Sequence, residues 1–292
     1  MSNAPAVLFD APGPKTRRNV RIGTIVAVVA ALGLAVAVIL RFAERGQLDW
    51  ELWSPLLDPT SDEFALVWPR LLSGLVVTIQ VAVVAMTASL LIGILLAVAR
   101  LSLGRYGRLP VIGFIELLRG LPVIVTIFYV SILLPTIGVD MDDFWFLVIG
   151  LTAYNCVVFS EILRAGIVSL PRGQVEAGLA IGLTQHQTMR LVQLPQAFRA
   201  MLPALISQLI VIVKDTALGS IVLNGVDDLM RQANQMRVPL DNPLQMFLVV
   251  ALIFITVNYA LDRLAQYVQR RMSTSTAAKV EGETSELSSV PA

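Results

Sequence analysis

Apolar runs of membrane-spanning length, separated by shorter polar segments, dominate this sequence. A hydrocarbon layer about 30 Å thick needs about 20 apolar helical residues to cross it, so each long gap between charged residues marks a candidate transmembrane helix. The chain contains six such gaps, and the fifth is interrupted by the charged pair Lys214-Asp215. The predicted spans are residues 22–40, 71–99, 120–139, 144–160, 200–223 and 244–261.

The segments outside the spans are tails and loops. Residues 1–21 form an N-terminal tail, and residues 41–69 form a long loop that separates the first helix from the other five. Residues 164–199 form a polar loop between the fourth and fifth spans. Residues 266–292 are rich in Ser, Thr and Glu, lack an apolar stripe, and are predicted to be disordered. The pattern therefore predicts an all-α membrane protein with six transmembrane helices.

The distribution of basic residues predicts the orientation, because Lys and Arg concentrate in cytoplasmic loops. With the N-terminus inside, sixteen of the 22 Lys and Arg residues fall on the inner side and five on the outer side, with Lys214 left within a span. Both termini and the loop 164–199 are therefore predicted to be cytoplasmic. An aromatic belt at the outer face agrees with this orientation and consists of Trp50, Trp53, Trp68 and Trp145.

Composition supports the membrane assignment and narrows the chemistry. Hydrophobic residues make up 56% of the chain and charged residues 15%, and the mean hydropathy is +0.74, which is unusual for a soluble domain of 292 residues. A net charge of +1 gives no reason to expect nucleic acid. The single cysteine, Cys156, cannot form an internal disulfide and is predicted to be a packing residue. No residue is predicted to be catalytic or to bind a metal, and His186 is predicted to be solvated.

Small residues recur at every fourth position in two spans, which allows helix backbones to approach closely. The stripe in the second span is the stronger prediction of a packed face, because small residues are common in membrane helices and that alone explains the first stripe equally well. The stripes are Ala85, Ser89, Gly93 and Ala97 in the second span, and Gly23, Ala27, Ala31 and Ala35 in the first.

The polar loop 164–199 carries signals for a rigid shape. Residues 174–181 have the length of two helical turns and end at Gly182, a plausible residue to terminate a helix. Thr184 followed three residues later by Gln187 has the form of a capping box that opens a second helix. This helix leads through Leu194-Pro195 into the membrane. The loop is thus predicted to protrude as a helix, a glycine corner and a helix; an ordinary surface loop is the alternative.

The same loop resembles a motif of the integral membrane subunits of bacterial ATP-binding-cassette importers, E-A-A, three residues, G, nine residues, I, one residue, L-P. In that family the motif is the docking site of a separate ATPase, so we name residues 164–199 the coupling loop. Gly178 stands in place of the second Ala, and Val192 in place of Ile. The matching positions are Glu176, Ala177, Gly178, Gly182, Val192, Leu194 and Pro195.

Three other segments resemble the branch of this family that serves polar amino acids. Residues 116–122 (E-L-L-R-G-L-P) are similar to its E-x-x-R-G-T-P signature, residues 173–177 (G-Q-V-E-A) to G-Q-x-E-A, and residues 214–218 (K-D-T-A-L) to K-D-T-S-L. The resemblance covers about residues 70–265. Because members often have five core spans, it implies a five-helix permease core over 70–265 and a peripheral first helix at 22–40.

The resemblance implies a set of partners in a bacterial inner membrane. They are a dimer of ATP-binding-cassette ATPases, a second permease subunit, identical or not, an external substrate-binding protein and a polar amino acid, with glutamate or a relative preferred. The chain has no G-x-x-x-x-G-K-[ST] phosphate-binding loop, so ATP would be bound by the partner and this chain would not be an enzyme. The alternatives are a secondary transporter driven by an ion gradient, and an assembly factor without transport.

Candidate residues of the substrate pathway are Lys214, Asp215, Thr216 and Arg119. Ionisable groups inside a membrane are costly and are functional candidates by default. Lys214 could attract a substrate carboxylate while Asp215 holds it in position or meets the amino group; a structural pair, or a cap on a broken helix, is the alternative. Arg119 precedes Gly120 and Pro122, where a helix is expected to start or break; a positive-inside anchor explains it equally.

Overall fold

The structure is a computed structural model that describes the backbone of residues 13–287 and the side chains of residues 13–267. Across this part of the chain it is helical, with no strand. Five helices are long and apolar enough to cross a membrane, and a sixth span results if the bent pair α4 and α5 counts as one. These helices are α1 (Pro14–Glu44), α3 (Asp62–Ser102), α4 (Arg108–Arg119), α5 (Val123–Thr136), α6 (Asp143–Val168), α9 (Leu194–Asp215) and α12 (Pro243–Leu287). The six-span all-α class is confirmed.

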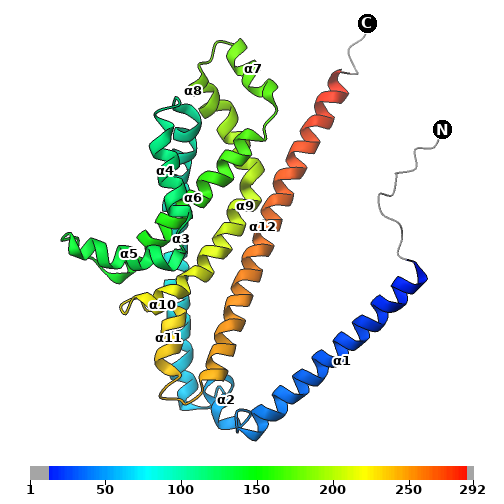
Figure 1. Cartoon of the computed structure of the whole chain (residues 1–292), viewed down its shortest axis with the longest axis vertical. Helices are drawn as coiled ribbons and strands as arrows, with labels where there is room; N and C mark the ends of the chain where they lie inside the picture. The colour runs from blue at the N-terminus through cyan, green and yellow to red at the C-terminus, as the bar shows by residue number, and fades with distance from the viewer. Residues whose placement is uncertain (1–12, 288–292) are drawn as a thin grey trace.

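Helix α6 lies at the centre of the core, with α3, α5 and α9 packed around it (Figure 1). Two glycines show how close the helices come. A Cβ atom on Gly93 of α3 would lie 2.7 Å from the Cβ of Phe159 in α6, and one on Gly150 of α6 would lie 2.7 Å from the Cα of Ile127 in α5. Such distances are too short for real Cβ atoms, so these contacts require glycine. The core therefore depends on small residues at the helix crossings.

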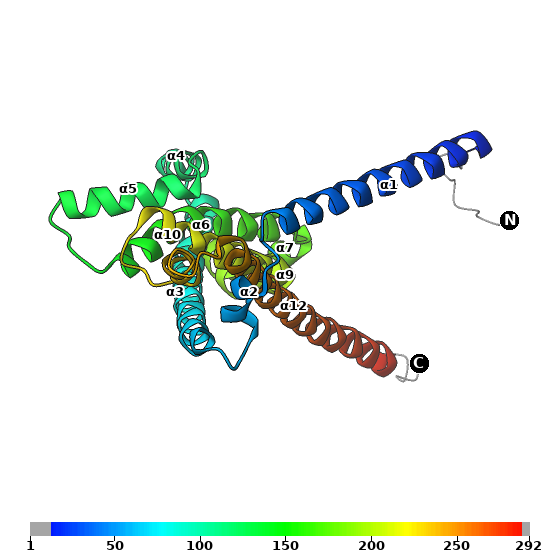
Figure 2. The same ribbon diagram turned by 90° about the horizontal axis from the view of Figure 1, so that it is seen from below.

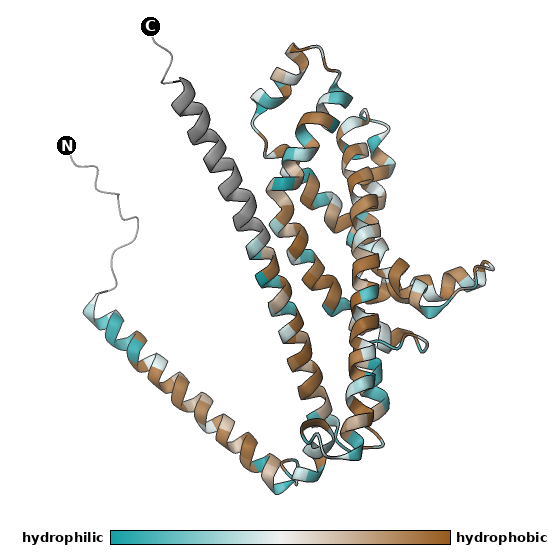
Figure 3. Ribbon diagram, turned by 180° about the vertical axis from the view of Figure 1, so that it is seen from behind, coloured by the Kyte–Doolittle hydropathy of each residue, from teal (hydrophilic) through white to brown (hydrophobic). Residues whose placement is uncertain are grey.

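The two predicted stripes of small residues have different outcomes. The stripe in α3 is confirmed as a packed face, because Ala85, Ser89, Gly93 and Ala97 are all buried. The stripe in α1 is exposed, and α1 as a whole has no buried residue. Figures 1 and 2 show α1 leaving the rest of the molecule from its C-terminal end, and Figure 3 shows it apolar except near its two ends. The first helix is thus peripheral to the core.

The segment between the first and second spans is more ordered than the predicted loop 41–69. It contains α2 (Trp50–Leu57) and the first turns of α3. The buried side chains of Asn242 and Gln245, at the start of α12, donate hydrogen bonds to the carbonyl oxygens of Leu52 (3.1 Å) and Gln47 (2.7 Å). The segment around α2 is therefore held to α12 by hydrogen bonds to backbone carbonyl oxygens. Every residue has such an oxygen, so the sequence does not indicate which ones are bonded.

Helix α11 (Leu229–Met236) lies along the first half of α3. Thr78 of α3 accepts a hydrogen bond from the backbone N–H of Leu229 (3.1 Å), and Asp228 caps the helix by accepting from the N–H of Arg231 (2.8 Å). Burial raises the pKa of Asp228 to about 6. Two orphan donors of the α11 N-terminus are therefore satisfied inside the protein.

The C-terminal segment differs from the prediction of a disordered tail over 266–292. Helix α12 continues to Leu287 without interruption. The sequence contains neither Pro nor Gly from 244 to 281, so nothing in it stops a helix that the membrane span has already nucleated. Residues 288–292, and residues 1–12 of the predicted N-terminal tail, lie outside the described part of the chain.

The close approach of α3 and α6 predicts that Gly93→Ala destabilises the protein. The new methyl group would meet Phe159 and the backbone carbonyl oxygen of Cys156, at 2.7 and 2.9 Å, and the helices would have to separate. We expect a loss of about 1–3 kcal/mol, seen as a lower thermal unfolding temperature in detergent. Gly33→Ala in α1 is the matched control, because its surroundings are open. Equal effects at the two positions would contradict the packing argument.

Candidate functional site

The coupling loop folds as a helix, a glycine corner and a helix, as the sequence predicts. Helix α7 (Arg172–Ala180) ends just before Gly182, which has a φ of 86°. Helix α8 (Gln185–Thr188) opens with a capping box in which the Thr184 hydroxyl accepts from the Gln187 N–H (3.3 Å) and the Gln187 carbonyl accepts from the Thr184 N–H (2.9 Å). The corner and the cap together give the loop a fixed shape.

The motif residues divide into an exposed and a supporting set. We call residues 172–188, which comprise α7, the glycine corner and α8, the knob; it stands at one end of the molecule (Figure 1). Glu176, Ala177 and Gly182 are exposed on it. Leu194 is half-buried and packs on a cluster formed by the ends of the membrane helices, while Pro195 is exposed in the first turn of α9. The exposed set is available to a partner, and the supporting set holds the knob on the membrane helices.

Gly178, the departure from the motif's second Ala, is buried in the contact between α7 and α8. A Cβ atom there would lie 2.8 Å from Cγ2 and 3.0 Å from Oγ1 of Thr188. Thr188 is itself buried, and its hydroxyl has no hydrogen-bond partner among the described residues. The sequence alone suggests a looser helix at Gly178, but the structure shows a position where glycine allows close packing against threonine.

The knob is tied to α9 by two further features. The Gln196 amide of α9 donates to the Gln174 carbonyl of α7 (3.0 Å). A π-helical turn, Met189–Gln193, joins α8 directly to α9. Wide turns of this kind are rare and are often found at functional sites. A displacement of α7 would therefore reach α9 through packing, a side-chain hydrogen bond and continuous helical backbone.

An ion-pair network joins the ends of α3 and α6 near the knob. Glu161 bonds Arg100 of α3 through one carboxylate oxygen, and its other oxygen accepts from Arg164 at 3.0 Å. The side chains of all three residues are half-buried or more. Glu161 and Arg164, three residues apart on α6, thus share one ion-pair network with α3. Buried charges are tolerated when they are paired in this way.

Lys214 and Asp215 occupy the last turn of α9. Lys214 is exposed and Asp215 is half-buried, and the part of the chain that the structure describes contains no ion pair between them. The helix ends at Asp215 and gives way to a 3-10 turn, Thr216–Leu218, and then to the short helix α10, Gly219–Val222. With about 1.5 Å per residue, Lys214 lies about 30 Å from the start of α9.

Thr216, the third candidate of this segment, is less accessible than Lys214 and Asp215. Its side chain is completely buried, and its hydroxyl donates to the carbonyl oxygen of Val213 (2.8 Å). Its place on the substrate pathway stays a prediction.

Arg119 is the last residue of α4, at the break predicted from Gly120 and Pro122. The chain turns by 105° there before α5 begins at Val123. Arg119 and Glu116 are both exposed, and no ion pair between them is found among the described residues. Helix α5 and helix α10 leave the body on the same side (Figures 1 and 2), so this break and the end of α9 open toward one face.

A buried amide pair between α6 and α9 went unnoticed in the sequence. The side-chain amide of Gln208 donates to the carbonyl oxygen of Asn155 (2.8 Å), and Asn155 is completely buried. Asn155 and Gln208 carry no charge, so the spacing of charged residues along the sequence does not reveal them. The signal that would have found them is a strong hydrogen-bonding group inside an otherwise apolar span.

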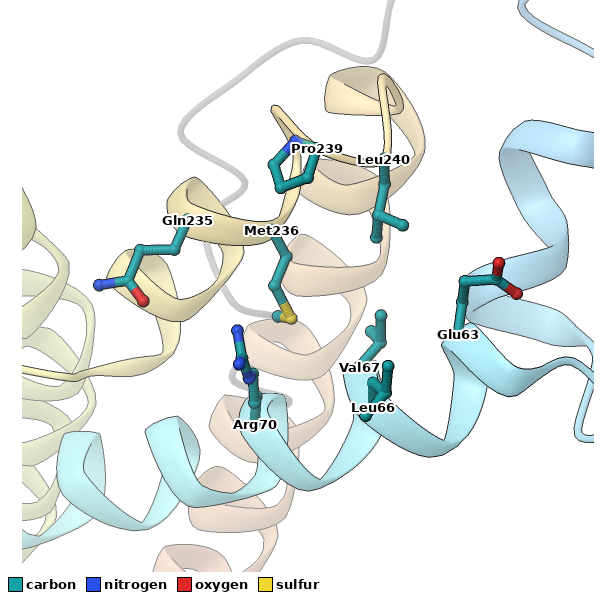
Figure 4. A pocket seen from close by; sticks show the side chains of 8 residues that line it. All are labelled: Glu63, Leu66, Val67, Arg70, Gln235, Met236, Pro239 and Leu240. Atoms are coloured by element: carbon teal, nitrogen blue, oxygen red, sulfur yellow. The ribbon is translucent and has the colours of Figure 1, made fainter.

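At the opposite end from the knob, α3 and α11 enclose a pocket of about 190 Å³. Its floor is apolar, and its opening carries one carboxylate and one guanidinium group (Figure 4). The residues that line it are Glu63, Leu66, Val67 and Arg70 of α3, with Gln235, Met236, Pro239 and Leu240.

This combination of a membrane-embedded helical core and an exposed coupling loop agrees with comparison to known proteins. Residues 89–274 match the family described as binding-protein-dependent transport system inner membrane component. The chain belongs to this family. The match includes the end of α3, the whole coupling loop and the helix that carries Lys214, so the family assignment rests on the part of the chain that forms the core.

Relatives and solved structures place the chain further within this family. It is 36% identical over 239 residues to the glutamate transport system permease protein GluD of Corynebacterium glutamicum, covering 80% of this chain and 85% of the relative. It is 33% identical to the glutamate/aspartate import permease protein GltK of Escherichia coli, covering 70% and 93%. The structure of an amino acid ABC transporter with histidines is similar with a TM-score of 0.65 and 30% identity, covering 73% and 99%.

The contact of Gly178 with Thr188 predicts that Gly178→Ala weakens the knob. We expect a loss of about 1–3 kcal/mol in local stability, seen as faster proteolytic cleavage within the coupling loop of the purified protein. Adding Thr188→Ala removes both atoms that the new methyl group meets, and the double variant should recover resistance. Gly173→Ala, in open surroundings on the same helix, is the control. A double variant no better than Gly178→Ala would contradict the contact.

Proposed function

We propose that the chain is the permease subunit of an ATP-driven importer for glutamate or a related polar amino acid in a bacterial inner membrane. Its partners are a second permease subunit, two ATP-binding-cassette ATPases and an external binding protein. The observation that carries this proposal is that the exposed knob of α7 and the exposed Lys214 stand at the two ends of one continuous run of helix, α8 to α9. Relatives that are permeases for glutamate and aspartate support the choice of cargo.

Coupling follows from the way the knob is built. Glu176, Ala177 and Gly182 are exposed where an ATPase could hold them. Gly178 packs α7 on α8, and Leu194 fixes the knob to the ends of the membrane helices. Closing of the ATPase dimer would push α7, and the π-helical turn would pass the displacement to α9. Because α9 packs on α6, the movement would alter the crossing of these helices and change which side of the membrane has access to the cargo.

Cargo binding is assigned to Lys214 and Asp215. Lys214 lies in a membrane span, and no carboxylate of the described residues comes within ion-pair distance of its ammonium group. A charge in that position is normally met by water, substrate or a partner chain. Lys214 would attract a carboxylate of the amino acid, and Asp215 would face its ammonium group. Arg119, at the break that opens toward the same face as α10, would add a second positive charge for an acidic cargo.

The orientation assigns the two ends to different partners. The knob and the C-terminal end of α12 lie toward one end of the molecule, and α1 rises from the opposite end in the same direction (Figure 1). The basic residues would place the knob end in the cytoplasm. The end formed by α2 and α11 would then face outward. Its pocket, which carries Glu63 and Arg70 at the opening, is part of the surface that the external binding protein would meet.

An ion-gradient transporter is the second candidate, since Lys214 and Asp215 could also carry protons. An ion-gradient transporter would have no use for the exposed knob, and it would respond differently to ATP and to a proton gradient. Uptake in proteoliposomes would ignore ATP and would stop when a protonophore collapses the proton gradient. ATP-dependent uptake that survives the protonophore contradicts the second candidate and supports the first.

Glu176→Lys should break the attachment to the ATPase. The variant reverses a charge on an exposed helix surface without touching the core, so the protein should fold normally. We expect the ATPase to be lost from the purified complex and ATP-dependent uptake to fall more than tenfold. Glu51→Lys, an exposed reversal on α2 at the other end, should retain the ATPase. Retention of a coupled ATPase by Glu176→Lys would contradict the proposed dock.

Lys214→Ala should abolish uptake while leaving the complex assembled. Removing the charge takes away the electrostatic attraction for a carboxylate, and an exposed side chain at a helix end is not needed for packing. Lys214→Arg keeps the charge and should recover part of the activity. Assembly is checked by copurification of the ATPase, with Lys15→Ala as the control outside the span. Normal transport by Lys214→Ala would remove Lys214 from the substrate pathway.

A further inference from the structure

Asn155 forms a hydrogen-bonded relay from α6 to α9 inside the membrane core. Its side-chain NH2 donates to the backbone carbonyl oxygen of Leu151 at 2.8 Å, one turn earlier in α6. Its side-chain oxygen accepts from the NH2 group of Gln208 at 2.8 Å. Asn155 is 0% exposed, so water does not compete for either bond. Both the NH2 group and the carbonyl oxygen of this side chain therefore have a hydrogen-bond partner.

The polarity of the relay follows from its first member. A backbone carbonyl can only accept, so the group that meets Leu151 must be the NH2 of Asn155. The oxygen of Asn155 then faces Gln208, and Gln208 must present its own NH2 group. The carbonyl oxygen of Gln208 is left without a hydrogen-bond partner among the residues that the structure describes. This assignment depends on chemical complementarity rather than on distinguishing nitrogen from oxygen by position.

Gln208 lies on the face of α9 that carries Asp215, one of the proposed cargo residues. It precedes Asp215 by seven residues, two helical turns, so the two side chains leave the helix in the same direction. Lys214 is six residues from Gln208, about 9 Å along the helix axis and about 120° around it. Gln208 and Asp215 are both only partly buried. The free acceptor of Gln208 therefore lies two turns from Asp215 on the same face, with Lys214 on the neighbouring face.

We propose that Asn155 is a positioning residue that fixes the amide of Gln208 with its carbonyl oxygen open, so that Gln208 binds the α-ammonium group of the amino acid cargo. A carboxamide that is free to rotate can present either a donor or an acceptor, whereas one held by Asn155 presents only the acceptor. Asp215, two turns further along the same face, also attracts the ammonium group, while Lys214 on the neighbouring face takes a carboxylate. Together the three residues recognise the two charged ends of an amino acid.

This inference rests on the proposed function and adds to it a way for the site to distinguish an amino acid from a dicarboxylate that has no ammonium group. An acceptor held in place favours a molecule with an N–H donor and gives nothing to a dicarboxylate of similar size that lacks one. Glutarate is such a molecule, because it is glutamate without the ammonium group. The site should therefore bind glutamate more tightly than glutarate, and the difference should depend on Asn155 even though Asn155 is sealed from the cargo.

The test is equilibrium binding of radiolabelled L-glutamate, with glutarate as competitor, to the purified permease–ATPase complex in lipid nanodiscs without the binding protein. We expect the wild type to prefer glutamate at least tenfold, the effect of about one charge-assisted hydrogen bond. Asn155→Leu should reduce this preference at least threefold while leaving glutarate binding unchanged, because Asp215 still attracts the ammonium group in the variant. Gln208→Leu should do the same, and the double variant should be no worse than Gln208→Leu alone.

The control is Thr152→Val, which changes a neighbouring buried hydroxyl of α6 that lacks a partner among the described residues. It should keep the full preference for glutamate. A wild type without preference, or an Asn155→Leu variant that weakens both ligands equally, overturns the inference and leaves the pair purely structural. If Asn155→Leu fails to assemble, Gln208→Leu decides alone: an unchanged preference overturns the inference. The proposed function fails separately, if the wild-type complex with its binding protein shows no ATP-dependent uptake.

Discussion

Lipid tails are as apolar as leucine, so helices inside a membrane gain little by hiding apolar side chains from their surroundings and are held together by close packing and hydrogen bonds. In this chain that packing centres on α6. Gly93 lets α3 approach Phe159, and Gly150 lets α5 approach through Ile127. The charged groups at the contact of α3 and α6 neutralise one another, because Glu161 is bonded to both Arg100 and Arg164. The positions of α3, α5 and α9 all follow from their contacts with this one helix.

A fixed core allows a small element outside the membrane to act on a group inside it. The knob of α7 is stiffened by Gly182 and the Thr184 cap and is joined to α9 by helical backbone. At its other end α9 tightens into the 3-10 turn Thr216–Leu218 and continues as α10. The break between α4 and α5 is different, because backbone that is broken at membrane depth needs cover from protein or water. In the proposed importer, a second permease subunit would supply that cover.

The sequence predicts much of this architecture, and the reasons for the failures are physical. Charge spacing is sufficient to find the spans, and turn chemistry is sufficient to place Gly182 and the Thr184 cap, because both are local. The attachment of the segment around α2 to α12 cannot be predicted from the sequence, because Asn242 and Gln245 bond to backbone carbonyl oxygens far away in the chain. The contact of Gly178 with Thr188 and the relay through Asn155 depend on which helix faces which. That information lies in tertiary packing rather than in any segment.

The central claim is that α7 is where an ATPase acts on this permease, and site-specific cross-linking tests it most directly. A photoactivatable residue placed at Ala177 lies on the exposed face of the knob, and one at Trp50 lies on α2 at the opposite end. In membranes that contain the whole transporter, illumination at Ala177 should give an adduct with the ATPase, and illumination at Trp50 should not. An ATPase adduct at Trp50 instead of Ala177, or no ATPase adduct at either position, would contradict the account.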